Sequence, residues 1–147
     1  MDMENYIKNR VDDQIEWYDK KSQTSQKLYK RTQIIEIILA ASIPILVPYV
    51  QSCKCISILV ALSGSIISIL EAITRLYKFH ENWIQYRTTS ELLKYHKYLY
   101  LTKSAPYNEA DETIENVFVR NIESIISSEN NTWKAINTNA KQDGDNN

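Results

Sequence analysis

Two long apolar runs joined by a very short linker constrain this chain more than any other feature. The first run, Ile34–Val50, reads "IIEIILAASIPILVPYV", and the second, Cys55–Ile73, reads "CISILVALSGSIISILEAI". Only "QSCK" lies between them. Each run has roughly 17 to 19 residues, the lower end of the length that spans a bilayer at about 1.5 Å rise per residue. The sequence therefore predicts a tight transmembrane helical hairpin.

A soluble three-helix bundle with two very apolar helices is the alternative interpretation. Consecutive apolar runs that lack a polar face are hard to keep in water, because each helix would need apolar cover on every side. The mean hydropathy of the chain is mildly negative. That average hides the distribution, since the apolar residues gather in the middle of the chain and both flanks are polar. We therefore expect a membrane protein whose first partner is the lipid bilayer.

Two carboxylates and two prolines interrupt the apolar runs, and the hairpin accounts for both. Glu36 begins the first run and Glu71 ends the second, so in a hairpin both lie near the membrane interface. A charge there costs far less than the roughly 2.5–3.5 kcal/mol assigned to the bilayer centre. Pro44 and Pro48 fall near the loop end, where a kink or a helix stop is tolerated.

Arg75 adds a cation to the same end of the hairpin. It follows Glu71 by four residues in the favourable acid-first order, and it is within reach of Glu36 across the hairpin. Two interpretations of Glu36, Glu71 and Arg75 stay open. They form either an interfacial salt-bridge cluster or a carboxylate ring at the mouth of an oligomeric pore.

Positive charge on the two outer flanks gives the orientation. Lysines and arginines precede the first run and follow the second, whereas the linker has only Lys54: Lys20, Lys21, Lys27, Lys30, Arg31, then Arg75 and Lys78. The positive-inside rule therefore places both termini in the cytoplasm. A cleavable signal peptide is not expected, because the apolar run starts too late and is followed at once by another.

The flanks carry helical periodicity, so the chain is predicted to be all-α. In residues 1–33, apolar side chains recur at three- and four-residue steps: Ile7, Val11, Ile15 and Tyr18. This cytoplasmic helix is expected to run into the first span. After the second span a heptad-like seam predicts one long helix to about Lys103: Leu76, Phe79, Trp83, Tyr86, Ser90, Leu93, Lys97 and Tyr100. "SAPYNEAD" then breaks that helix at Pro106.

A last helix and a polar tail complete the predicted organisation. Asn108 or Asp111 caps this helix, whose apolar stripe is Ile114, Phe118, Ile122, Ile125 and Trp133. It is expected to pack back on the stalk, which is the long helix predicted from the end of the second span to about Lys103. The prediction is thus one domain over 1–136, with a cytoplasmic helix over 1–33, transmembrane helices over 34–50 and 55–73, and cytoplasmic helices over 74–136. Residues 137–147, "NTNAKQDGDNN", have nothing to bury and are expected to be disordered.

One face of the second span collects small residues. They recur at steps of four, three, four and four: Ser57, Ala61, Gly64, Ser68 and Ala72. Small residues let helices approach closely in lipid. The face serves packing against the first span within one hairpin, or packing between subunits with Ser63, Ser65 or Ser68 facing water. The two interpretations do not exclude each other.

Signals for catalysis, cofactors or metals are missing from the sequence. His80 and His96 are too far apart to pair on one helical turn as metal ligands do. The chain has two glycines and no glycine-rich phosphate loop. Cys53 and Cys55 form a lone C-x-C, which is a weak zinc signal, and a bridge between such close neighbours would be strained. We expect free thiols or an intersubunit disulfide, no enzymatic activity and, given the balanced charge, no nucleic-acid partner.

Several segments resemble the SLATT family of bacterial domains with two transmembrane helices, one subgroup of which is catalogued only as a domain of unknown function. The resemblance covers about Asp12 to Trp133. Its most specific parts are Trp17-Tyr18-Asp19-Lys20-Lys21, Glu81-Asn82-Trp83, Tyr86-Arg87, and Lys97-Tyr98-Leu99-Tyr100 leading to Pro106-Tyr107. Most members carry a glutamate where His96 stands and a glycine where Ala105 stands. These departures leave the fold assignment intact but weaken any role for a charged network at His96.

The resemblance implies a function that the periodicity does not show. Such domains are predicted effectors of bacterial conflict systems, often encoded beside nucleotide-signal synthases or sensors. On activation they would form homo-oligomers, open a pore or disrupt the inner membrane, and arrest or kill the infected cell. A separate nucleotide-signal sensor or synthase would then supply the trigger. The alternative is a membrane-anchored helical interaction module, in which the hairpin is only an anchor and the seam from Trp83 to Tyr100 docks a soluble partner.

Overall fold

The computed structural model describes residues 2–108 and 114–128, and every regular element in these ranges is a helix. The all-α prediction is therefore confirmed for this part of the chain. Trp133 and the tail expected to be disordered, 137–147, lie outside the described residues. The chain divides into two compact units. We call Met1–Gln23 with Asn82–Asn147 the core unit, and Thr24–Glu81 the hairpin unit.

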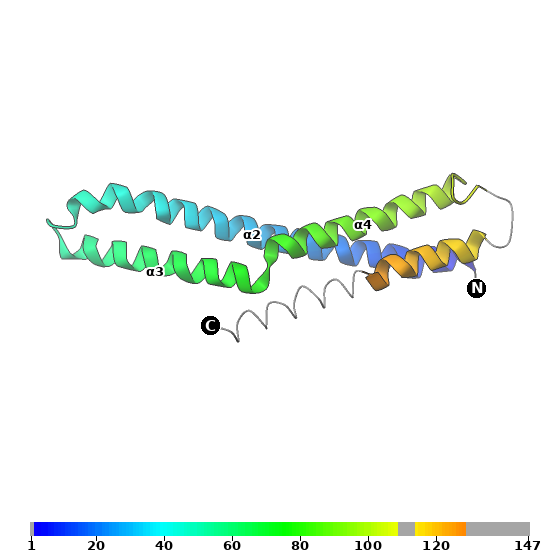
Figure 1. Cartoon of the computed structure of the whole chain (residues 1–147), viewed down its shortest axis with the longest axis horizontal. Helices are drawn as coiled ribbons and strands as arrows, with labels where there is room; N and C mark the ends of the chain where they lie inside the picture. Colours follow the sequence, from blue (N-terminus) through cyan, green and yellow to red (C-terminus); the bar gives the residue numbers. More distant parts are fainter. Residues whose placement is uncertain (1, 109–113, 129–147) are drawn as a thin grey trace. The chain divides into compact units, whose positions relative to one another are not determined.

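One continuous helix connects the N-terminal segment with the first apolar run (Figure 1). It begins after a short helix, α1 (Met3–Tyr6), and a π-helical stretch, η1 (Ile7–Asp12). Asp2 caps α1 by accepting a hydrogen bond from the amide of Glu4. Helix α2 then extends over Asp13–Leu46 with Pro44 inside it, and a 3₁₀ turn, η2 (Val47–Tyr49), carries Pro48. The prolines thus mark the end of the helix, where the lost hydrogen bonds matter least.

The second apolar run and the stalk are two helices rather than the single helix expected from the sequence. Helix α3 covers Lys54–Tyr77 and α4 covers Phe79–Leu101. Between them Lys78 has a left-handed backbone (φ 46°) and its amide bonds the carbonyl of Thr74. Such a helix end usually needs glycine, because a side chain costs about 1–2 kcal/mol there. A lysine gives no sequence signal for this break, which is why the periodicity missed it.

The described core lies wholly in the core unit. Its buried apolar side chains come from the N-terminal helices, α4, the segment after α4 and the helix over 114–128: Tyr6, Val11, Tyr18, Leu93, Tyr107, Phe118, Ile122 and Ile126. Phe118 stacks on Tyr100 with 4.3 Å between ring centroids and meets Tyr107 and Tyr6 edge-on. The last helix therefore packs back on the stalk within this unit, as the stripe of Phe118 and Ile122 indicates.

Candidate functional site

No apolar side chain of the hairpin unit is buried. Two helical stretches in the described residues, Met3–Tyr49 and Lys54–Leu101, are long and apolar enough to cross a membrane, with mean hydropathies of 1.6 and 2.2 in their most apolar windows. None of the residues in those windows is buried. Ile38 is 62% exposed and Leu62 is 54% exposed. The core helix of a soluble protein would be covered by its neighbours, so length, composition and exposure together favour an apolar solvent.

Polar side chains occur at the end of the two apolar runs that is farther from the linker. Nε of Arg75 lies 2.8 Å from Oε1 of Glu71, one helical turn away. Oε2 of Glu36 accepts a hydrogen bond of 3.0 Å from the amide of Gln33. Among the described residues, Oε1 of Glu36 and Oγ1 of Thr74 are buried atoms that have no hydrogen-bond partner. Arg75 thus pairs with Glu71 rather than with Glu36, and one buried carboxylate oxygen of Glu36 has no partner among the described residues.

The small-residue face of α3 is open. Ser57, Ala61, Ser68 and Ala72 are exposed and Gly64 is half-buried. A Cβ atom built on Gly64 would have no heavy atom within 4 Å. Close packing against α2 would fill that space, so the contact that small residues permit is not made within this chain.

Three serine hydroxyls of α3 donate hydrogen bonds to backbone carbonyls of the preceding helical turn. Ser63, Ser65 and Ser68 donate to the carbonyls of Leu59, Ala61 and Gly64 at 2.8, 3.0 and 3.0 Å. A hydroxyl bonded to the preceding turn needs no water, which suits a helix in lipid.

The linker between the runs presents two free thiols. Cys53 and Cys55 are both exposed and neither forms a disulfide. Cys53 has an extended backbone just before the first residue of α3. Their accessibility makes them useful positions for chemical labelling.

A polar seam joins α2 to α4 within the core unit. Asp19 accepts hydrogen bonds from Oγ of Ser90 at 2.7 Å and from Nζ of Lys94 at 2.8 Å. Seven residues earlier, Oδ1 of Asp12 accepts from Nζ of Lys97 at 2.5 Å. Burial raises the pKa of Asp19, but the bonds from Lys94 and Ser90 more than offset it and hold that pKa below its usual value.

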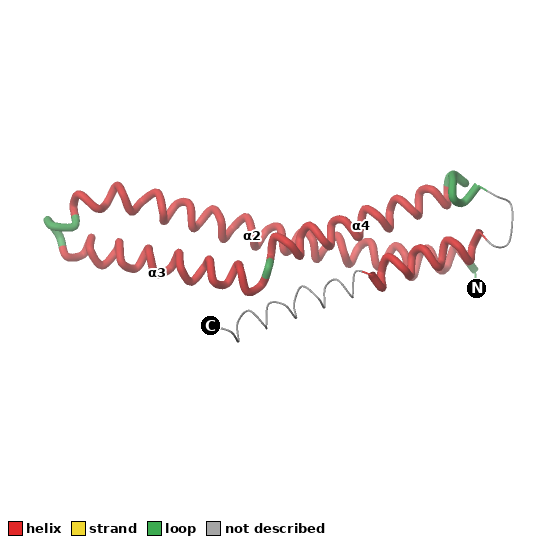
Figure 2. Tube along the Cα trace, viewed as in Figure 1, coloured by secondary structure: helices red, strands yellow, loops and turns green. Residues whose placement is uncertain are grey.

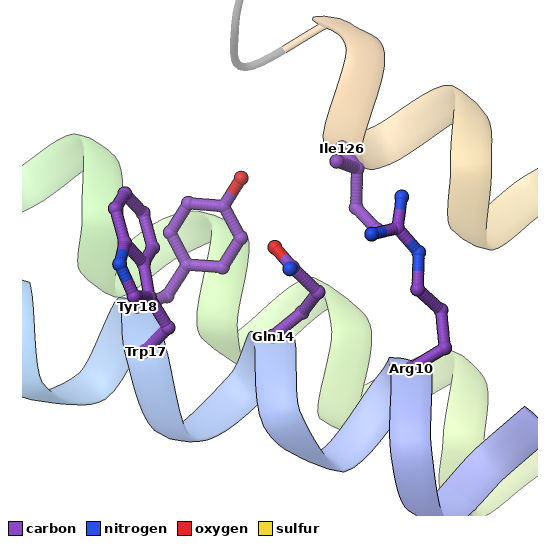
Figure 3. Close-up of a pocket in the computed structure, with 5 residues that line it drawn as sticks. All are labelled: Arg10, Gln14, Trp17, Tyr18 and Ile126. Atoms are coloured by element: carbon purple, nitrogen blue, oxygen red, sulfur yellow. The ribbon is translucent and has the colours of Figure 1, made fainter.

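Two surface pockets occur in the described part of the core unit. The smaller, about 280 Å³, is lined by side chains of η1, α2 and the helix over 114–128 (Figure 3): Arg10, Gln14, Trp17, Tyr18 and Ile126. Its Arg10 is engaged by Glu123, whose oxygens lie 3.0 Å from Nε and 2.9 Å from Nη2. The larger, about 680 Å³, lies between the N-terminal helices and the end of α4, next to the Asp12–Lys97 pair.

The two histidines lie in different units, and no group of three or more potential metal ligands occurs among the described residues. His80 contacts Tyr29 with 4.9 Å between ring centroids. Nδ1 of His96 lies 2.7 Å from the hydroxyl of Tyr107, which accepts a bond of 2.9 Å from Asn121. Burial lowers the pKa of His96.

Comparison with known proteins places the chain in a family. The profile of the DUF4231 family, described as proteins of unknown function, matches residues 13–115. The chain belongs to the DUF4231 family. The match spans α2, both apolar runs and α4. No curated protein and no solved structure matches the chain.

Sequence reasoning missed two parts of the DUF4231 chain that the structure brings together. The buried contact of His96, Tyr107 and Asn121 joins three segments that have no common periodicity. Ser90 was expected in the seam but not as the fully buried partner of Asp19. The sequence did contain a usable signal for this contact. Asp12 and Asp19 are seven residues apart, as are Ser90 and Lys97, and in an antiparallel helix pair equal spacings place each aspartate opposite a hydrogen-bond donor.

Proposed function

We propose that this DUF4231 protein is a membrane effector of a bacterial defence or conflict system, acting as a homo-oligomer that forms a pore or perturbs the inner membrane. In this proposal α3 and the second half of α2 span the bilayer as a hairpin, with both termini in the cytoplasm. The core unit is then the cytoplasmic part that gates it. The observation that carries the membrane assignment is that neither apolar window contains a buried residue.

The open face of α3 supports assembly from several copies. Its small side chains are turned away from contacts within the chain, and the space beside Gly64 is empty. In lipid, helices associate through close backbone approach at such positions rather than through hydrophobicity. A second copy of the chain supplies a helix of matching length and composition, so a homo-oligomer is the simplest partner.

The polar residues at the cytoplasmic end of the hairpin fit a pore mouth. Assembly around an axis would repeat Glu36 and Glu71 in each subunit and form rings of carboxylates, which attract cations. The Arg75–Glu71 pair moderates that charge. The interfacial-clamp interpretation of the same residues remains the competing one, and it predicts an effect on stability alone.

The effector role rests on the resemblance to the SLATT family rather than on geometry. The triggering partner in this proposal is a separate nucleotide-signal sensor or synthase. Topology is tested first with membrane-impermeant maleimide on intact cells. Labelling of Cys53 and Cys55 from outside supports the hairpin, whereas labelling only after lysis contradicts it.

Pore formation is tested by release of an encapsulated dye from liposomes that contain the purified protein. We expect release from the wild type, and reduced release from Gly64→Leu, which fills the open face. Ile69→Val on the outward face of α3 is the matched control and should behave as wild type. Absence of leakage in every oligomeric state, together with absence of toxicity on overexpression, would refute the proposal.

The carboxylates are tested in the same vesicles by ion selectivity. Glu36→Gln with Glu71→Gln should lower the preference for cations over anions, while Glu81→Gln, outside the apolar runs, should leave it unchanged. A double variant that is only less stable, with selectivity retained, assigns the glutamates to the clamp.

A membrane-anchored interaction module is the second candidate, and one observation favours it. The seam from Trp83 to Tyr100 is largely occupied within the core unit, since Leu93 and Ser90 are fully buried. The opposite face of α4, however, exposes the aromatic side chains of Tyr95 and Tyr98. Exposed aromatics are common anchors of protein interfaces. Docking of a soluble partner would therefore use this outer face rather than the seam.

Replacing the hairpin with an unrelated two-helix anchor separates the two candidates. Retained function would show that the apolar helices serve only as an anchor and would favour docking through Tyr95 and Tyr98. Lost function, with normal expression and membrane targeting, would favour a hairpin that works in the bilayer.

A further inference from the structure

The outward face of α2 changes from isoleucine to cation without a break in the helix. Ile45, Ile38 and Ile34 lie on one stripe at steps of seven and four, and Arg31 and Lys27 continue it at steps of three and four. All five residues are exposed. Because residues 27–45 belong to one uninterrupted helix, the cations and the isoleucines face the same surroundings.

The cations lie at the depth of the phosphate layer if the apolar runs are in lipid. Arg31 precedes Ile34 by three residues and Lys27 precedes it by seven, which is about 4.5 and 10 Å along the axis. The polar layer on each side of a bilayer is about 5–8 Å thick. Arg31 therefore lies within this layer and Lys27 lies just outside it, while Lys30 stands between them along the axis and is also exposed.

The carboxylates of the hairpin unit leave this stripe uncompensated. Glu71 is engaged by Arg75 at 2.8 Å. The side chains of Lys27 and Arg31 form no ion pair or hydrogen bond with another described residue. Their charge is therefore available to an anion outside the chain.

Two aromatic side chains suited to an interface lie where α3 ends and α4 begins. The rings of Tyr77 and Phe79 stack with 5.5 Å between centroids and an interplanar angle of 4°. Tyr77 is exposed next to the end of the apolar run. Tyrosine is enriched at the headgroup level of membranes, where its ring meets hydrocarbon and its hydroxyl meets water. The first apolar run is thus preceded by cations, and the second is followed by aromatic side chains suited to an interface.

We propose that Lys27, Lys30 and Arg31 form a binding site for the phosphate groups of anionic phospholipids in the cytoplasmic leaflet. This inference rests on the proposed membrane insertion of the hairpin and adds a lipid class to it. Attraction to an anionic surface contributes about a five-fold preference per cation, about 1 kcal/mol. It weakens with salt, because the Debye length falls from about 10 Å at 0.1 M to about 3 Å at 1 M.

Electron spin resonance with spin-labelled lipids measures this preference. The full-length protein is reconstituted in phosphatidylcholine vesicles that contain a trace of spin-labelled phosphatidylglycerol or phosphatidylcholine. Lipids that touch the protein give a motionally restricted component, and its size in the two samples gives their relative association constant. We expect a preference of at least about five-fold for phosphatidylglycerol at low salt, which is the contribution of one cation, and a fall toward unity at 1 M salt.

Variants locate the site. The triple variant Lys27→Gln, Lys30→Gln, Arg31→Gln should reduce the preference to near unity while keeping the restricted component. The matched control, Lys8→Gln, Lys54→Gln, Lys103→Gln, removes three other exposed lysines and should keep the wild-type preference. The salt series needs no variant, so the inference stays testable if the triple variant fails to fold.

The outcomes separate this inference from the proposed function. Absence of any restricted component means that the helices are not in lipid, which overturns both. A restricted component with equal association constants for the two lipids, or with a preference that survives the triple variant, overturns the lipid site alone. Loss of the preference on addition of inorganic phosphate would assign the site to free phosphate and would also overturn it.

Discussion

Replacing Leu62 by lysine distinguishes lipid from water as the surroundings of α3. Leu62 lies near the middle of the second apolar run and is 54% exposed. In water, exchanging an exposed leucine for lysine changes stability by about 0.5 kcal/mol or less. In a bilayer, leucine at the centre contributes about −0.5 kcal/mol to insertion and lysine costs about 3 kcal/mol. The difference of about 3–4 kcal/mol lowers the insertion equilibrium several hundred-fold.

The chain contains its own reporter for this experiment. Asn130-Asn131-Thr132 matches the acceptor motif for N-glycosylation, which occurs only on the lumenal side of microsomes. With both termini on the cytoplasmic side, the wild type synthesised in the presence of microsomes should stay unglycosylated. Leu62→Lys should produce a glycosylated fraction because α3 then fails to span. Adding Ile66→Lys should raise that fraction, since the two costs sum to about 6–8 kcal/mol.

Tyr98→Lys provides the matched control. Tyr98 is 64% exposed but lies on α4 in the core unit, so the same charge should leave topology unchanged. The lipid argument would be wrong if the double lysine variant kept the wild-type pattern, or if wild type and variants all stayed in the soluble fraction.

Three further predictions concern packing, pH and assembly. Phe118→Ala should lower the free energy of unfolding of the core unit by about 3–5 kcal/mol, measured by denaturation in detergent. The reason is that Phe118 is fully buried among Tyr6, Tyr100 and Tyr107. Tyr98→Ala, on the exposed side, should change the free energy of unfolding little, and equal effects of the two variants would contradict the packing. Asp19 has a pKa below its usual value, so the stability that it contributes is present above about pH 4 and is lost as the pH falls through the folded-state value. Asp19→Asn should reduce this loss of unfolding free energy at acid pH, and an unchanged loss would exclude Asp19 as its source. Gly64→Ala should not destabilise the monomer, since no heavy atom lies within 4 Å of the added methyl group and alanine is favoured over glycine inside a helix by about 0.5–1 kcal/mol. Gly64→Leu should reduce chemical crosslinking between copies in membranes, and unaltered crosslinking would remove this face from the interface.

Composition and periodicity were sufficient for the helical class and for most of the core. The stripe through Val11 and Tyr18, and the later one through Phe118 and Ile122, name side chains that the structure buries. Periodicity works there because each helix has one face toward its neighbours. The prediction that Leu76 begins the heptad-like seam was wrong, since Leu76 is 65% exposed. The left-handed backbone of Lys78 ends α3 before the stalk helix begins.

The candidate site could be predicted only as a set of residues, not as contacts. Spacing predicts that Glu71 pairs with Arg75 one turn on, and these two side chains do lie 2.8 Å apart. Spacing does not decide which way the small-residue face of α3 turns, because that depends on the rotation of α3 about its own axis. Gly64 resolves the question for a single chain, since its surroundings are empty. The environment of Tyr107 was equally out of reach, because Asn121 and His96 approach it from separate segments.

The two aspartates of the polar seam restrict how α2 and α4 can move past each other. Sliding by one helical turn, about 5.4 Å, would carry Asp19 away from Lys94 and Ser90 and Asp12 away from Lys97. Loss of its donors costs Asp19, whose side chain is 26% exposed, on the order of 1–3 kcal/mol. The cost is smaller for Asp12, whose side chain is 43% exposed to water. The two aspartates therefore favour a single register of α2 against α4. A change of register requires a step of a whole helical turn or separation of the two helices.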